Sequence, residues 1–71
     1  MSWATLDQRI RHTAEAVLTD RQLTVVRARV DGHSWDRIAL ALNLDEATVR
    51  GHWKRAVRRL KPHLTEGDLA A

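Results

Sequence analysis

Apolar residues recur every three or four positions in four segments of the chain, with short polar breaks between them and no strand-like alternation. This spacing places them on one face of an α-helix, so the pattern predicts an all-α fold of four helices. The first helix is expected over residues 2–17, with Ser2 as its N-cap. If it starts later, Thr5 and Gln8 have the spacing of a capping box. Its apolar positions are Trp3, Leu6, Ile10, Ala14 and Val17.

The second helix is expected over residues 19–31. Thr19 and Gln22 have the spacing of a capping box at its start. Gly32 suits the left-handed conformation that often ends a helix. The apolar face consists of Leu23, Val26 and Val30, with Val25 beside them. The basic residues Arg27 and Arg29 point away from this face. They are either phosphate contacts or, as is usual for exposed arginines on a helix, solvated.

Residues 34–60 contain a short helix, a three-residue break and a longer helix. Ser34 is the expected N-cap of the short helix, because its hydroxyl can accept an orphan backbone N–H. In the break, Asn43 tolerates the left-handed conformation, and Asp45 caps the helix that follows. Pro62 ends that helix, since proline lacks a backbone donor and disfavours helix in the residue before it. The apolar positions are Ile38, Ala39, Leu42, Val49, Trp53, Ala56 and Leu60. This layout predicts a helix-turn-helix at the C-terminal end of the fold.

Basic residues are concentrated in the last of these helices. Residues 1–45 hold six Lys/Arg and six Asp/Glu, whereas residues 46–63 hold six Lys/Arg and a single acid, Glu46. On a helical wheel the cationic side chains lie opposite the apolar ones. A helix with one buried and one cationic face suits the phosphate-lined major groove of double-stranded DNA. The helix over about residues 46–60 is therefore the expected recognition helix.

Candidate DNA contacts follow from the position of each residue in this motif. Arg37 begins the shorter helix and Thr48 opens the longer one, so both are expected to contact phosphate without reading sequence. Arg55 and Arg58 lie further along the recognition helix and are also expected to meet phosphate. The residues expected nearest the base edges are Glu46, Ala47, Arg50, Gly51 and Lys54.

Four of the helix residues carry more specific expectations. Arg50 is the first choice for a guanine contact, and Glu46 has an acceptor for cytosine. The alternative for Arg50 is a solvated side chain or a salt bridge to Glu46, four residues earlier. Gly51 either lets the backbone approach a base or phosphate, or is a tolerated surface glycine at a cost of about 1 kcal/mol. Trp53, at the centre of the apolar face, is predicted to be buried.

The same stretch resembles two known families of DNA-binding domains over residues 18–61. The shared positions are Leu18 to Gln22, Val25-Val26, Ser34, Ile38-Ala39, Leu42, Leu44, Thr48-Val49-Arg50, Arg55-Ala56 and Leu60. They are similar to region 4 of extracytoplasmic-function sigma factors and nearly as similar to the DNA-binding domain of LuxR-type regulators, where His52 also fits. Both resemblances imply a four-helix DNA reader whose last helix enters the major groove. Trp35 and Trp53 depart from the pattern, because these families usually have smaller residues there.

The resemblance also bears on partners. A chain of 71 residues leaves no room for the second sigma domain or for the sensor or receiver domain of most LuxR-type proteins. LuxR-type domains pair through a further helix after the recognition helix, for which Pro62 leaves no evident room. Sigma region 4 binds as one copy and relies on RNA polymerase. The expected state is therefore a monomer or weak homodimer, with RNA polymerase or another transcription protein as a possible second partner.

Other classes of function fit the sequence poorly. The chain has no cysteine and its four histidines are scattered, so neither a metal site nor a cofactor is predicted. No nucleophile lies in a recognisable turn, and an enzyme is not expected. No apolar run approaches the roughly 20 residues of a membrane span, so the expected location is the cytoplasm. Residues 1–63 are expected to form one domain, and residues 64–71 a flexible tail.

Three functions remain open. The first is sequence-specific DNA binding by a small transcriptional regulator. The second is a protein-interaction module that binds RNA polymerase, a sigma factor or an anti-sigma protein, which predicts an accessible Trp3 or Trp35. The third is a phage or mobile-element accessory protein that binds DNA with the same fold. The first helix likewise has two open roles, since it either covers the core or offers a partner surface with Trp3 as its anchor.

Overall fold

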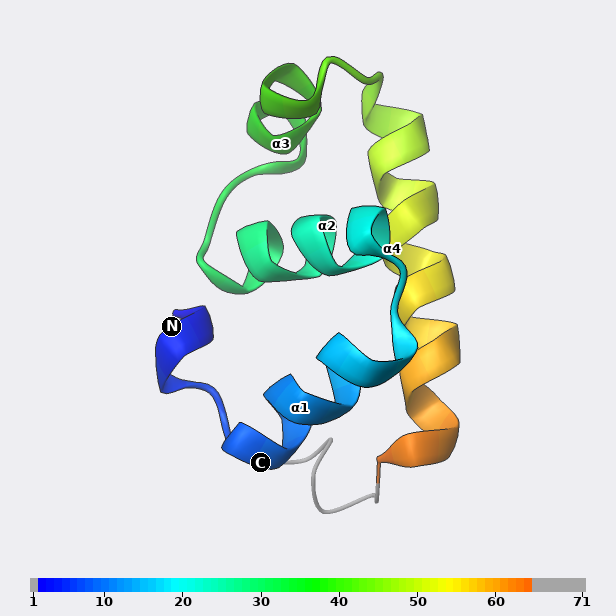
Figure 1. Ribbon diagram of the computed structural model, residues 1–71. Helices are drawn as coiled ribbons and strands as arrows, with labels where there is room; N and C mark the ends of the chain where they lie inside the picture. The colour runs from blue at the N-terminus through cyan, green and yellow to red at the C-terminus, as the bar shows by residue number, and fades with distance from the viewer. Residues whose placement is uncertain (1, 65–71) are drawn as a thin grey trace.

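Helices account for every regular element of the computed structural model, which describes residues 2–64. Within those residues four α-helices are flanked by two short 3-10 helices, and there is no strand. The elements in chain order are η1 (Trp3–Thr5), α1 (Gln8–Val17), α2 (Asp20–Val30), α3 (Trp35–Leu42), α4 (Glu46–Leu60) and η2 (Lys61–His63) (Figure 1). The predicted all-α fold with four helices is confirmed. None of these helices is long and apolar enough to cross a membrane.

The N-terminal segment departs from the predicted single helix over residues 2–17. The chain forms η1, becomes extended at Leu6 (φ −68°, ψ 152°) and starts α1 anew at Gln8. Asp7 is the N-cap of α1, because its carboxylate accepts the Arg9 backbone N–H at 2.8 Å. Aspartate favours such caps over helix interiors, and the apolar spacing continues through the break. The alternative capping box of Thr5 and Gln8 is also wrong, since Gln8 is already the first helical residue.

The start and end of α2 follow the prediction closely. The Gln22 backbone N–H donates to Thr19 Oγ1 at 3.2 Å, and the Thr19 N–H donates to Gln22 Oε1 at 3.1 Å. The reciprocal pair is the predicted capping box. At the other end Asp31 is the C-cap, and Gly32 follows with a φ of +97°. That positive φ is the left-handed region that glycine enters without a steric penalty.

The turn between α3 and α4 is held by local hydrogen bonds. Asn43 adopts the left-handed conformation (φ 56°, ψ 44°), and the next amide, of Leu44, donates to the Ala39 carbonyl at 2.9 Å. Asp45 caps α4 by accepting the Thr48 backbone N–H at 2.7 Å. This bond, with the Thr48 hydroxyl, holds the pKa of the Asp45 carboxyl below its usual value. The predicted three-residue break of the helix-turn-helix is thus confirmed.

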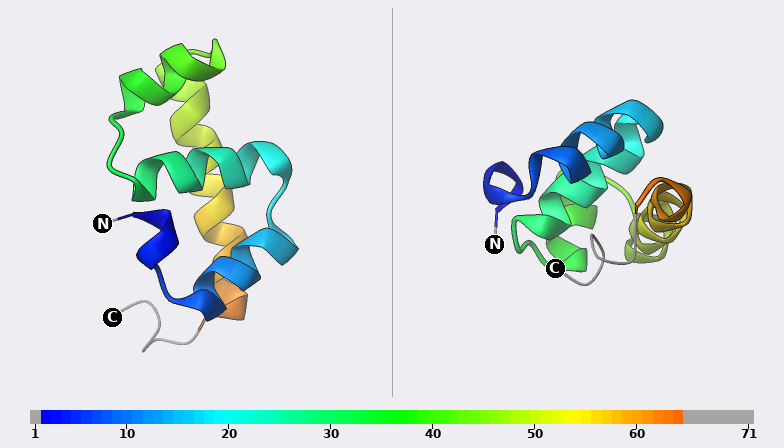
Figure 2. Two further views of the ribbon diagram at one scale, coloured as in Figure 1. Left: turned by 60° about the vertical axis from the view of Figure 1, so that its left-hand side comes forward. Right: turned by 90° about the horizontal axis from the view of Figure 1, so that it is seen from below.

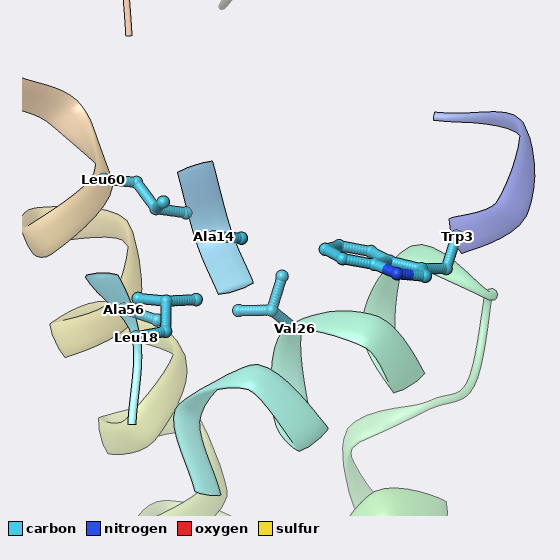
Figure 3. Packing of buried hydrophobic residues seen from close by; sticks show 6 residues of the cluster. All are labelled: Trp3, Ala14, Leu18, Val26, Ala56 and Leu60. Carbon is cyan, nitrogen blue, oxygen red and sulfur yellow. The ribbon is translucent and has the colours of Figure 1, made fainter. Parts of the chain in front are cut away.

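Two hydrophobic clusters are joined by α4, which runs the length of the molecule. In the views of Figures 1 and 2, α3, α2 and α1 follow one another along the same side of α4. The first cluster gathers Trp3, Ala14, Leu18, Val26, Ala56 and Leu60 (Figure 3). The second gathers Val25, Ile38, Ala39 and Val49. The second cluster therefore supports the helix-turn-helix, and the first supports the C-terminal half of α4.

Trp53 lies between the two clusters and packs against both. It is half-buried, so the prediction of a buried Trp53 is wrong in degree. The other side of its ring reaches the surface, where Trp53 lines a shallow hollow with Lys54 and Val57.

Trp3 shows the role of the N-terminal segment. Its side chain is only 8% exposed, and its backbone N–H donates to Asp31 Oδ1 at 2.6 Å. The Arg27 guanidinium lies 5.8 Å from its ring centroid. Trp3 therefore covers the core, and is not an exposed anchor for a partner. Leu64, the first residue of the predicted tail, also packs against this cluster, and residues 65–71 lie outside the described residues.

Candidate nucleic-acid interface

One side of α4 faces away from α1, α2 and α3 (Figures 1 and 2). At 100° per residue from Val49, the small residues Ala47 and Gly51 lie at the centre of that side. Arg50 and Lys54 flank them on one edge, and Arg55 flanks them on the other. Of the predicted contacts on this helix, Thr48 and Gly51 are partly buried and the rest are exposed: Glu46, Ala47, Arg50, Lys54, Arg55 and Arg58. Arg50, Lys54, Arg55 and Arg58 thus give this side of α4 an accessible, cationic surface.

Arg50 and Glu46 form an ion pair on the first turns of α4. The Arg50 Nε and Nη2 groups donate to the same carboxylate oxygen, Glu46 Oε1, at 3.1 Å and 2.7 Å. This is the salt bridge that the sequence offered as an alternative for Arg50. Both side chains are about half exposed (53% and 46%), so the pair contributes at most about 1 kcal/mol to stability. Its main consequence is to fix where the guanidinium lies.

Trp35 joins three helices beside this pair. The guanidinium carbons of Arg29 and Arg50 lie 4.3 Å and 5.5 Å from its ring centroid. Its ring meets that of Trp53 edge-on, with centroids 5.8 Å apart and an interplanar angle of 67°. Arg29 Nη1 also donates to the His33 carbonyl at 3.0 Å, and this bond joins the loop before α3 to α2. The expectation of a solvated Arg29 is therefore wrong.

Sequence reasoning missed Trp35 as a member of the site. The sequence indicated only that a tryptophan replaces a smaller residue there, and that Trp35 would be accessible in a protein-interaction module. The available signal was an aromatic side chain at the first position of α3, next to an arginine-rich helix pair. Cation–π pairs of this kind contribute about 0.5–2 kcal/mol, depending on their desolvation.

The head group of Arg55 lies closer to the middle of α4 than the position of Arg55 in the sequence indicates. Its side chain runs back along the helix, as helical side chains do, and its guanidinium nitrogens lie 3.6 Å from where a Cβ of Gly51 would be. Arg55 Nη2 is also 3.3 Å from His52 Nδ1. Gly51 therefore leaves room beside the Arg55 head group, which stands next to the centre of the accessible face.

The remaining candidates fall into two places. Lys54 and Arg58 of α4 line one hollow together with Lys61, the first residue of η2, so three cations lie around it. Arg37 lies apart from them, exposed on α3, where its backbone N–H is capped by Ser34 Oγ at 3.4 Å. The same Ser34 hydroxyl is the main cause of a lowered pKa at Asp36. No group of three His, Asp or Glu side chains within residues 2–64 has the arrangement to hold a metal ion.

Comparison with known proteins places this architecture in a family. The family model of bacterial regulatory proteins, LuxR family (GerE), matches residues 16–65. The match begins at the end of α1 and includes α2, α3, α4 and η2, so η1 and most of α1 lie outside it. No curated protein and no solved structure matches the chain. Of the two resemblances seen in the sequence, the match supports the LuxR-type one and does not address sigma region 4. The chain belongs to the LuxR family of bacterial regulatory proteins and carries its helix-turn-helix DNA-binding domain.

Proposed function

We propose that this chain is a sequence-specific transcriptional regulator that inserts α4 into the major groove of double-stranded DNA. The observation that carries the proposal is the accessible cationic side of α4, opposite the side that packs on α1, α2 and α3. Small residues at its centre, Ala47 and Gly51, let the helix backbone approach base edges closely. The helix-turn-helix holds α4 at both its first turn and its middle, so that the reading surface is rigid.

The candidate contacts divide by role. Glu46, Ala47, Arg50, Gly51 and Lys54 belong to the base-reading stretch of α4. Arg37 and Thr48 position the protein on phosphate, as does Arg58 further along the helix. Arg55 was first assigned to phosphate from its position alone. Its location beside Gly51 adds a second role for it at the edge of the reading surface.

The alternative of a protein-interaction module receives less support. It predicts that Trp3 or Trp35 is accessible, but Trp3 is 8% exposed and Trp35 is partly buried between cations. The large apolar side chain that does stand out among the described residues is Leu40, at 84% exposure. A single exposed leucine is ordinary for a soluble domain. An accessory DNA-binding role in a phage or mobile element would use the same chemistry and differ in genomic context.

A second partner belongs to the proposal, because one recognition helix reads few base pairs and one module buries little surface. The partner is either a second copy of the chain on a two-fold DNA site or RNA polymerase. In free solution we expect a monomer or weak homodimer, because the N-terminal segment that offered a spare apolar surface is packed on the core. Sedimentation velocity at micromolar concentration tests this, and a tight dimer without DNA would contradict it.

The proposed function itself is tested by selection from a randomised DNA library. The chain is incubated with the library at moderate salt, and the retained DNA is sequenced over successive rounds. We expect one short motif to be enriched, and affinity for that motif to fall steeply with salt. A matched control carries Lys54→Ala and Arg58→Ala, which removes two cations of the accessible face. If the parent chain, like this control, enriches no motif, the proposal of sequence-specific binding is wrong.

A further inference from the structure

The Arg50 guanidinium is held from two directions before any DNA is present. Glu46, one turn earlier on α4, accepts two of its N–H groups through a single oxygen. Trp35, from the start of α3, presents its ring 5.5 Å from the guanidinium carbon. A long arginine side chain on a helix surface is ordinarily free to sample many rotamers. Here one contact is ionic and the other is a cation–π contact, and they come from different helices.

The hydrogen-bond donors of Arg50 show what this arrangement leaves available. A guanidinium has five N–H donors in a rigid planar fork. Glu46 occupies the edge formed by Nε and one hydrogen of Nη2. The opposite edge, formed by Nη1 and the second hydrogen of Nη2, is not used by this carboxylate. Two parallel donors at that edge match the O6 and N7 acceptors that guanine presents in the major groove.

Trp35 is itself held in place. Arg29 lies 4.3 Å from its ring centroid and is tied to the His33 carbonyl, and Trp53 meets the ring edge-on. The indole is therefore held in one orientation, between the α2–α3 loop and the first turns of α4. A ligand group that is already ordered loses less conformational entropy on binding, which strengthens the contact that it makes.

We propose that Trp35 and Glu46 are positioning residues that present Arg50 end-on to a guanine in the major groove. In this proposal Glu46 supports the arginine and does not itself read cytosine, the role expected of it from its position in the sequence. The inference rests on the proposed function, because it assigns a base to one residue of the same surface. It adds a residue of α3, Trp35, to the determinants of sequence preference.

The experiment compares base preference and overall affinity, starting from four proteins. These are the parent chain and the variants Trp35→Leu, Glu46→Ala and Arg50→Ala, each selected on the same randomised library. Arg59→Ala is the matched control, since it removes one exposed arginine of α4 from outside the predicted contact set and leaves the contacts of Arg50 and Trp35 in place. Circular dichroism establishes that each variant is folded at the assay temperature. A double-variant series, with Arg50→Ala combined with each of the other two, reports whether they act through Arg50.

We expect Arg50→Ala to remove a guanine preference at one position of the motif. Trp35→Leu and Glu46→Ala should each reduce that preference about fivefold or more, whereas binding to unrelated DNA changes little. In the Arg50→Ala background neither change should alter the preference further. Arg59→Ala should keep the guanine preference.

Several outcomes would overturn the inference. One is a parent motif whose guanine preference survives both Trp35→Leu and Glu46→Ala. Another is a cytosine preference that disappears with Glu46→Ala while the guanine preference stays. If Trp35→Leu does not fold, Glu46→Ala and Trp35→Phe decide the question in its place. If the parent chain enriches no motif at all, the proposed function fails first, and that result is distinct from a motif that these variants leave unchanged.

Discussion

The two hydrophobic clusters of this small protein do different work. The second cluster packs α2, α3 and the first half of α4 together, and all of it lies within residues 16–65, which match the LuxR family model. The first cluster includes Trp3, which comes from outside the matched residues, and it supports the C-terminal half of α4. The reading end of α4 thus packs only on residues within the matched range, whereas its far end also packs on residues that precede that range. Because α4 contributes residues to both clusters, it connects the two ends.

The largest effect that tests this comparison comes from Trp3. Trp3→Ala removes a nearly enclosed indole from the first cluster and should cost about 3–5 kcal/mol, enough to unfold a domain this small. Thermal unfolding followed by circular dichroism measures the loss. Leu40→Ala is the control, because that side chain is 84% exposed and its removal should change the melting temperature little.

Trp53→Ala sharpens the same test at the junction of the clusters. The ring is partly exposed, so we expect a smaller loss than for Trp3, about 2–3 kcal/mol. Trp53→Ala should also widen the transition if the clusters begin to melt separately. A loss larger than that of Trp3→Ala would mean that the junction, and not the first cluster, is the main source of stability.

At the reading end, Arg50→Ala should weaken binding to the selected motif by about 1–3 kcal/mol. The cause is the loss of a guanidinium that Glu46 and Trp35 hold on the accessible side of α4. Binding isotherms on the motif and on an unrelated duplex measure the change. Arg59→Ala removes the same charge from an exposed position outside the predicted contact set, so it serves as the control. Equal losses for both variants would place Arg50 among the phosphate contacts.

Arg37→Ala should have a smaller and more uniform effect. Arg37 is exposed on α3, away from the group on α4, so it is expected to touch phosphate only. Its removal should weaken binding to all duplexes alike and make the slope of log affinity against log salt shallower by about one unit. A loss confined to the selected motif would contradict the positioning role.

The helix-turn-helix should also lose stability in acid through Asp45. Its carboxylate accepts the Thr48 N–H, so the pKa is lower in the folded chain than the value of about 3.9 expected when unfolded. A lowered pKa means that the stabilisation is present above that value and is lost as the pH falls through the folded pKa. Asp45→Asn, which caps without a charge, should flatten this dependence in melts at about pH 7, 4 and 2.5. Unchanged dependence in the variant would assign it to other carboxylates.

Most of the fold followed from local signals. Thr19, Ser34, Asn43 and Asp45 end or begin helices through bonds to residues within five positions of themselves, so sequence spacing was sufficient to place them. The break at Asp7 was missed because the apolar spacing continues across it, although aspartate there is itself a cap signal. A local capping signal locates the start of a helix only when no apolar pattern of helical spacing continues across that start.

Less of the candidate site was predictable, because part of it depends on contacts between helices and not on spacing within one helix. The pairing of Glu46 with Arg50 is an i,i+4 contact on one helix and appeared among the alternatives. The stacking of Arg29 and Arg50 on Trp35 depends on how α2, α3 and α4 approach one another. Residue spacing contains no information on that approach. The degree of Trp53 burial was missed for the same reason, because it is set by the meeting of two clusters.

Gly51→Ala has the smallest expected effect, and its outcome decides between the two interpretations of Gly51. A Cβ added there would meet the Arg55 guanidinium at 3.6 Å, which is ordinary van der Waals contact, so Gly51→Ala fits the helix without strain. Alanine should then stabilise the fold by about 1 kcal/mol, because glycine is a poor helix former. If the backbone approaches DNA at this point, the same variant should bind the selected motif more weakly despite its higher melting temperature. Thermal melts and binding isotherms on one preparation measure both quantities, and higher stability with unchanged affinity would identify Gly51 as a tolerated surface glycine.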